Sequence, residues 1–233
     1  MALPDTRGHF ISLGDDETDE VYLKVYESVL SHQLQPGTKL PEEKLAEIFG
    51  VTRSKIRKVL TRLEHEQIVA IIHNRGAFVA QPSIDQASDT LEARRVIEPA
   101  IARMLAEKAT KDDIRALRKH VEAEYAAHDA DDKPTIIRLV GEFHNLAAEL
   151  AGNAAMTRTL RELTALTCLT ILLYEAPTAS SCLPDDHVLL TDAIERRDPD
   201  VAAEIMVRHL KDVESSLVFD KPQTDVDLAA IFR

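Results

Sequence analysis

The residues best suited to chemistry begin with a basic segment in an otherwise acidic chain. It reads Gly50-Val51-Thr52-Arg53-Ser54-Lys55-Ile56-Arg57-Lys58-Val59-Leu60. Gly50 is suited to ending one helix and Thr52 to capping the next, and no acid interrupts the cations that follow. The free N–H groups and positive dipole end of such a helix favour an anion. The segment therefore predicts a helix whose outward cations lie against DNA, as the second helix of a helix-turn-helix does.

Three of the nine histidines have a spacing that suits metal binding. His187 and His209 lie equally far in sequence from Asp198, where a proline follows and a turn between two helices is predicted. Antiparallel helices joined there would bring both imidazoles to the same height. His144, on another predicted core helix, can supply a third nitrogen. Three neutral imidazoles suit Zn(II), Ni(II) or another borderline divalent ion, although a lone buried histidine is often only a satisfied core residue.

Residues 40–49 predict the supporting helix of the helix-turn-helix. Lys44 projects from its start, within reach of a phosphate. Leu45, Ile48 and Phe49 are expected to face inward, because their spacing follows one side of a helix. This helix would hold the basic helix in place.

Residues 67–79 contain two β-rich runs separated by a turn, which predicts a hairpin wing. The tip of the wing runs from His73 through Asn74 and Arg75 to Gly76. It offers short polar groups and one cation to a groove edge or to the DNA backbone.

Composition limits the class of protein further. The formal net charge is −12 over 233 residues, but attraction to DNA depends on the local footprint and not on the sum. The two cysteines, Cys168 and Cys182, lack Cys-x-x-Cys spacing, and no signal peptide or membrane-spanning run is recognisable. These features predict a cytoplasmic protein with reduced thiols.

The second half of the chain predicts only helices. Ser83 with Gln86, and Thr110 with Asp113, have the spacing of capping boxes. The fold class is therefore mainly α: a winged helix-turn-helix followed by an all-α six-helix bundle. The bundle helices are expected near residues 84–108, 111–128, 132–151, 154–176, 184–197 and 199–217. The expected divisions are a flexible arm at 1–17, a DNA-binding domain at 18–82, an effector-binding and dimerisation domain at 83–220 and a tail at 221–233.

Three motifs make residues 18–82 resemble the winged-helix domain of GntR-type bacterial transcriptional regulators. They are Pro-Gly-Thr-Lys-Leu-Pro-Glu-Glu, Gly-Val-Thr-Arg-Ser and Asn-Arg-Gly-Ala-Phe-Val. The resemblance implies that Lys44, Thr52, Arg53, Ser54, Arg57, His73 and Gly76 lie at or near the operator. The sequence itself adds Lys55, Asn74 and Arg75 to these candidates.

The second half resembles the FadR-like subfamily, whose C-terminal FCD domain binds an effector. The matching segments are Glu92-Ala93-Arg94-Arg95-Val96-Ile97-Glu98, Glu142-Phe143-His144, Ala151-Gly152-Asn153, Asp186-His187 and Ala202-Ala203-Glu204-Ile205-Met206-Val207-Arg208-His209-Leu210. The resemblance implies a homodimer, and in metal-binding members His144, His187 and His209 match the ligands of a divalent metal such as Zn, Ni or Mn.

A fourth ligand in those members is usually an Asp or Asn one turn before the first histidine, where this chain has Val140. Three outcomes are consistent with that departure: a metal held by three histidines and a water or effector carboxylate, a substitute ligand such as Glu142, or no metal.

Arg94 is the other candidate for the effector pocket, together with the three histidines. A guanidinium can bind a carboxylate through two hydrogen bonds. The competing interpretation is a helix salt bridge from Arg94 to Glu98, one turn later.

The sequence thus predicts a dimeric, ligand-responsive transcription factor, a repressor in the usual behaviour of the family, that binds an operator and a small organic acid. It is not predicted to be an enzyme. Two alternatives remain: a metal-dependent enzyme that uses the three-histidine site, and an architectural DNA-binding protein without an effector.

Overall fold

The computed structural model describes residues 16–30, 33–175 and 184–218. Cys182, the predicted C-terminal tail and residues 1–15 of the predicted arm lie outside these ranges. Helix α1 begins at Asp16, so it takes up the last two residues of the range expected as an arm.

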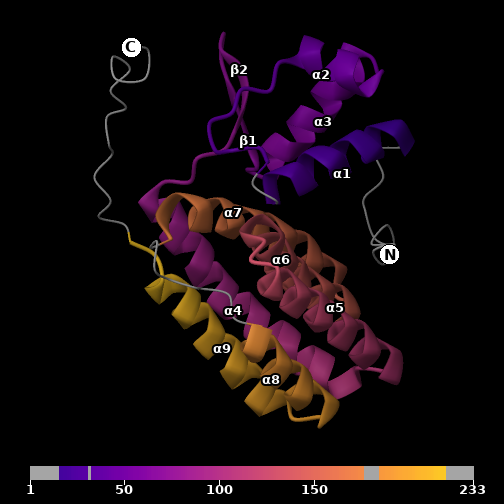
Figure 1. The fold of residues 1–233 in the computed structure, drawn as a ribbon, viewed down its shortest axis with the longest axis vertical. Helices are drawn as coiled ribbons and strands as arrows, with labels where there is room; N and C mark the ends of the chain where they lie inside the picture. Colours follow the sequence, from indigo (N-terminus) through magenta and orange to yellow (C-terminus); the bar gives the residue numbers. More distant parts are fainter. Residues whose placement is uncertain (1–15, 31–32, 176–183, 219–233) are drawn as a thin grey trace.

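The N-terminal part is a winged helix-turn-helix, which Figure 1 shows at one end of the molecule. Its helices are α1 (Asp16–Leu30), α2 (Glu42–Phe49) and α3 (Arg53–His65). Strands β1 (Val69–Ile72) and β2 (Gly76–Val79) pair antiparallel and form the wing.

The turn between α2 and α3 follows from the residues predicted to form it. Gly50 ends α2 in the left-handed region, with φ of +67°, which favours glycine. The Thr52 side chain accepts a hydrogen bond from the backbone N–H of Lys55 and so caps α3. Leu60 and Leu63 of α3 are fully buried against α1 and the wing. The expectation that Ile48 faces inward is wrong, because its side chain is 62% exposed.

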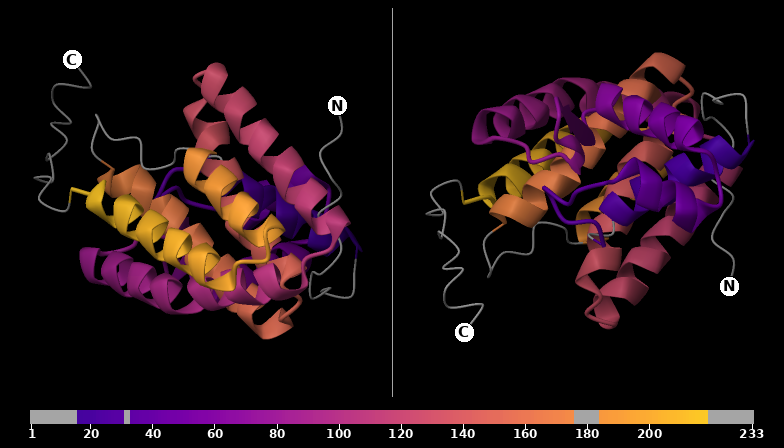
Figure 2. Two further views of the ribbon diagram at one scale, coloured as in Figure 1. Left: turned by 90° about the horizontal axis from the view of Figure 1, so that it is seen from below. Right: turned by 90° about the horizontal axis from the view of Figure 1, so that it is seen from above.

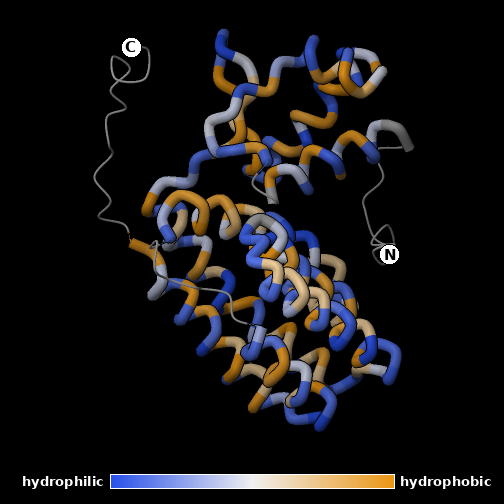
Figure 3. The backbone as a smooth tube through the Cα atoms, in the orientation of Figure 1, coloured by the Kyte–Doolittle hydropathy of each residue, from blue (hydrophilic) through white to orange (hydrophobic). Residues whose placement is uncertain are grey.

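Within the described residues the C-terminal part folds as six helices, as the sequence predicted. Both predicted capping boxes are present, from Ser83 with Gln86 and from Thr110 with Asp113. Apolar and polar residues are interspersed along the helices (Figure 3), and the buried apolar residues of all six pack into the core. The helices are α4 (Ile84–Lys108), α5 (Lys111–Asp129), α6 (Lys133–Leu150), α7 (Ala154–Tyr174), α8 (Pro184–Glu195) and α9 (Pro199–Ser215).

The long helix α4 runs beside α9 and also contacts α6, α7 and α8, so it packs against most of the other helices of the bundle. Figure 2 shows α4 and α9 side by side when the molecule is seen from below. None of the helices in the described ranges is long and apolar enough to cross a membrane.

The winged helix-turn-helix from α1 to β2, called the head below, rests on the bundle through α1. This helix contacts both α6 and α7. The Tyr26 hydroxyl donates to the backbone carbonyl of Arg161, and the Gln67 side-chain amide donates to Glu162 at 2.9 Å. Both acceptors belong to α7. The head is therefore attached to the same two helices that, on their other side, line the centre of the bundle.

Candidate DNA-binding surface and histidine centre

The predicted DNA-contacting residues of α3 lie at its exposed N-terminal end. Thr52, Arg53, Ser54 and Arg57 are all exposed, whereas Lys55 is partly buried. The exposed N–H groups at this end and the cations beside it give an anion two kinds of partner. The arrangement agrees with the predicted orientation of α3, with Lys55 less accessible than expected.

Two of these cations are held in place by acids of α2. Arg53 lies 2.7 Å from a carboxylate oxygen of Glu43, and Arg57 donates two hydrogen bonds to Glu42 at 2.7 and 3.0 Å. Exposed ion pairs of this kind contribute little stability, commonly below about 1 kcal/mol. A phosphate or base edge can therefore replace the carboxylates at low cost.

The wing tip lies between the strand ends, where Ile72 pairs with Gly76. Asn74 adopts a φ of +60°, in the region that suits a tight hairpin turn. His73, Asn74, Arg75 and Gly76 are all exposed, as is Lys44 on α2. The predicted wing residues are thus accessible to a partner.

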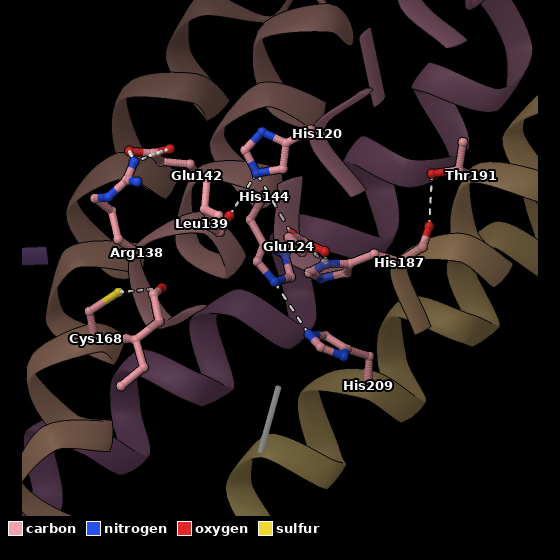
Figure 4. Close-up of polar contacts among 11 residues, drawn as sticks. His120, Glu124, Arg138, Leu139, Glu142, His144, Cys168, His187, Thr191 and His209 are labelled. Atoms are coloured by element: carbon pink, nitrogen blue, oxygen red, sulfur yellow. Dashed lines mark hydrogen bonds and ion pairs between the residues drawn. The ribbon is translucent and has the colours of Figure 1, made fainter. Parts of the chain in front are cut away.

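The three histidines predicted to converge do so inside the bundle (Figure 4). His144 comes from α6, His187 from α8 and His209 from α9, and their side chains are 2%, 1% and 3% exposed. The ring centroids lie 5.0 to 5.2 Å apart. One nitrogen from each ring can be chosen so that all three lie within 4.8 Å of one another.

Each histidine has a carboxylate beside its Nδ1 atom. Nδ1 of His144 lies 2.5 Å from Glu98, and Nδ1 of His187 lies 2.9 Å from Glu124. The third pair is Nδ1 of His209 and Asp186, at 3.3 Å. A carboxylate that accepts from Nδ1–H leaves Nε2 with its lone pair, as in the carboxylate–histidine pairs of metal sites.

The Nε2 atoms therefore face the shared centre. Those of His144 and His209 lie 3.3 Å apart, and Nε2 of His187 is buried without a hydrogen-bond partner among the described residues. A buried nitrogen without a partner is costly unless another group binds it. The donor set, three imidazoles with carboxylates behind them, fits a divalent ion such as Zn, Ni or Mn.

Burial favours the neutral form of His144 and His187, which is the form that binds a metal. Burial lowers the pKa of His144 to about 3, although the neighbouring Glu98 opposes the shift. Burial, with His209 nearby, also places the pKa of His187 well below its ordinary value. Burial would raise the pKa of Glu98, but Arg94 and His144 together hold it well below its usual range.

The pKa of Glu124 shifts in the opposite direction to that of Glu98, because its charged neighbours are histidines and not an arginine. Burial raises the pKa of Glu124 to about 8, and His120 and His209 only partly oppose this. A cation at the histidine centre would favour the ionised form of Glu124.

Arg94 forms the intrahelical salt bridge that was its competing interpretation. Its Nε donates to Glu98 at 2.5 Å, and both side chains are buried. Its Nη2, however, is buried and has no hydrogen-bond partner within the described ranges. Nη2 belongs to a side chain that lines a small cavity beside His144 and His209. The guanidinium thus has one nitrogen engaged and another available.

Glu142, the substitute ligand considered from the sequence, pairs with an arginine of its own helix. It accepts two hydrogen bonds from Arg138, at 2.8 and 2.9 Å, one turn before it on α6. Figure 4 shows this pair turned away from the three imidazoles. Val140 is buried and lines the cavity beside His144, so the position at which the family resemblance implied a fourth ligand does face this cavity.

Sequence reasoning missed the carboxylates behind the imidazoles. Glu124 shares the inward side of α5 with Leu117 and Val121, so an acid at that spacing was a recognisable sign of a buried group. Asp186 is adjacent to His187, and Glu98 had been considered only as a partner of Arg94. Which acid meets which histidine depends on how five helices pack.

The fold and these two sites define the class: a DNA-binding regulator in which a winged helix-turn-helix is joined to a helical bundle with a buried polar centre. Residues 17–79 match the gntR family of bacterial regulatory proteins, and residues 89–212 match the FCD domain. The chain therefore belongs to the GntR family, in its FCD-containing branch. It is a transcriptional regulator and not an enzyme.

Similar proteins include named repressors. The chain is 28% identical over 216 residues to the transcriptional repressor NanR of Salmonella newport, with 79% of each chain covered. It is 23% identical over 199 residues to the transcriptional repressor RspR of Escherichia coli K12, which covers 85% of this chain and 87% of the relative.

Solved structures support the fold. Escherichia coli McbR/YncC aligns with a TM-score of 0.75 at 16% identity, covering 88% of this chain and 97% of that one. A GntR-type putative transcriptional regulator from Rhodococcus sp. RHA1 aligns with a TM-score of 0.74 at 18% identity, covering 86% and 97%.

Replacing Glu98 tests the electrostatic description of this centre. Glu98→Ala leaves the Arg94 guanidinium buried without its carboxylate, so we expect the free energy of unfolding to fall by about 3–5 kcal/mol. Urea unfolding followed by circular dichroism measures the change. Glu92→Ala, an exposed acid on the same helix, is the matched control and should alter it by less than about 0.5 kcal/mol. Equal effects of the two substitutions would contradict the description.

Proposed function

We propose that this chain is an operator-binding repressor whose FCD domain binds a small organic acid at a divalent metal. The observation that carries the proposal is the convergence of three buried imidazoles, each with a carboxyl group beside its Nδ1 atom. An inert dimerisation bundle has no need of such a group, because burying polar side chains is costly. The architectural alternative is therefore disfavoured.

The DNA-binding unit is residues 18–82, and its contacts are proposed at two places. The N-terminal end of α3 and Lys44 would bind one groove and its phosphates, and the wing tip would bind the adjoining groove edge. The exposure of these side chains supports the assignment. The proposed contacts are Lys44, Thr52, Arg53, Ser54, Lys55, Arg57, His73, Asn74, Arg75 and Gly76.

The effector unit is residues 83–220, and its metal ligands are proposed to be His144, His187 and His209. A bound divalent metal supplies a Lewis-acidic centre that attracts an anionic ligand. Arg94, through its available Nη2, would bind a carboxylate of that ligand. Val140 adds no fourth ligand, which leaves room in the metal's coordination shell for a water or the effector itself.

Regulation is proposed to occur in a homodimer in the bacterial cytoplasm, where operator DNA is found. Two-fold symmetric operators require two heads at a fixed spacing. The effector would relieve repression if it binds more tightly to the arrangement that cannot reach both half-sites. The relatives named as repressors support this direction of control.

The DNA assignment is tested by Arg53→Ala and Lys44→Ala in an operator-binding titration. Arg53→Ala should cost about 1–3 kcal/mol on the operator and relax base discrimination, whereas Lys44→Ala should weaken binding on all sequences and reduce the salt slope by about one. Lys111→Ala, at the start of bundle helix α5, is the control and should leave binding unchanged. An equal loss on operator and random DNA for Arg53→Ala would overturn its base-reading role.

The metal assignment is tested by plasma mass spectrometry on protein purified without a His-tag or chelator. We expect about one equivalent per chain, lost in His144→Ala/His187→Ala and kept in His65→Ala, which changes an exposed histidine. Val140→Asp should slow the loss of metal to a chelator, because it adds a carboxylate to the lining of the same cavity. Absence of metal after incubation with divalent ions would overturn the assignment.

A further inference from the structure

The cavity beside His144 and His209 is lined by a few polar groups and by several aliphatic side chains, and this lining limits which effectors can bind. It lies among α4, α6, α7 and α9, and its volume of about 10 Å³ is enough for roughly one water molecule. Apart from the two histidines, its polar groups lie on α4 and α7. Four buried aliphatic side chains also contribute to the lining: Ile137, Val140, Ile171 and Val213.

The polar atoms available to a ligand are few. Arg94 Nη2 and Thr164 Oγ1 are both buried without a hydrogen-bond partner in the described part of the chain. Thr167 also lines the cavity, but its hydroxyl already donates to the Leu163 carbonyl at 2.8 Å. Besides the Nε2 atoms that face the centre, the lining therefore offers one guanidinium nitrogen and one hydroxyl.

We propose that the effector is a short monocarboxylate with an apolar body and at most one further polar group. This inference rests on the proposed function, which supplies the carboxylate anchor. The Thr164 hydroxyl would bind the single further polar group. Additional hydroxyls or a second carboxylate would meet the aliphatic side chains and lose their hydrogen bonds to water. The small cavity also favours a short body, because a longer one displaces more of the lining.

The test uses acids with four carbons, so that size stays nearly constant while polarity changes. Calorimetry on the full chain loaded with Zn(II) compares butyrate and 2-hydroxybutyrate with 2,3,4-trihydroxybutyrate and succinate. We expect the first two to bind at least about tenfold more tightly. Thr164→Val should remove most of the advantage of 2-hydroxybutyrate over butyrate.

The possible failures are distinguishable. Tightest binding of the trihydroxy acid or of succinate would overturn the inferred class while leaving the carboxylate sensor intact. Binding of none of the four acids would count against the carboxylate sensor itself, and the inference would fall with it.

A separate observation concerns how this cavity is coupled to the head. At Gly141, α6 and α7 approach each other so closely that a Cβ atom would lie 3.0 Å from Thr164 Cγ2 and 3.1 Å from Cys168 Sγ. These side chains line the cavity, and α1 of the DNA-binding head packs on the same two helices. A cavity with room for about one water can admit a carboxylate only if its lining moves.

We infer that the contact between α6 and α7 at Gly141 is the element through which a ligand shifts the head. Widening this contact displaces the two surfaces on which α1 rests. The inference depends on the helix contacts and not on the identity of the ligand.

Gly141→Ala tests this inference without any ligand. The added methyl should separate α6 and α7 slightly and lower operator affinity at least about tenfold, the direction in which the proposed effector would act. Adding Thr164→Ser, which removes the Cγ2 atom nearest the new methyl, should restore most of the affinity. Thermal unfolding of each variant distinguishes this effect from loss of fold. A folded Gly141→Ala protein with unchanged operator affinity would overturn the inference.

Discussion

The bundle depends on a set of polar side chains, all of them buried except the partly exposed Asp186, that pair with one another at its centre. Each helix except α7 contributes at least one member, so the packing of the bundle and the assembly of the site are the same event. An unpaired buried charge is far more costly than a pair, which makes partial assembly unfavourable. Glu98 connects two members of the set, because its carboxylate contacts both Arg94 and His144. The set comprises Arg94, Glu98, Glu124, His144, Asp186, His187 and His209.

In the head, cations of α3 form exposed ion pairs with acids of α2. An acidic chain has to present cations to DNA, and it does so by concentrating them on one short helix and aligning two of them with acids of the preceding helix. The pairs of Arg53 with Glu43 and of Arg57 with Glu42 are exposed, so they orient the guanidinium groups without binding them tightly. A net charge of −12 is therefore compatible with a local surface for phosphate.

Sequence alone predicted the elements whose signals are local. The capping residues Thr52, Ser83 and Thr110 fixed where three helices begin. The equal spacing of His187 and His209 about a turn predicted that their imidazoles lie together. Both signals depend only on short-range geometry. The sequence could not predict which side chains of different helices pair, because Glu124 contacts His187 only when α5 packs against α8. His144 was expected from its place on a core helix, and the family resemblance strengthened that expectation. For Arg94 the salt bridge to Glu98 is present, and the ligand role stays a prediction that concerns a different nitrogen of the guanidinium.

The docking of α1 has a consequence for how the chain is made. Tyr26 reaches Arg161 across 135 positions, yet α1 also packs on α3 within the head. During synthesis the helix-turn-helix and its wing are complete before α6 and α7 leave the ribosome, and domains generally fold in that order. The reader of DNA is thus assembled before the part that senses the ligand, and the joint between them closes last. A chain interrupted midway would therefore keep a folded helix-turn-helix and wing but lack the helices that are proposed to sense the ligand.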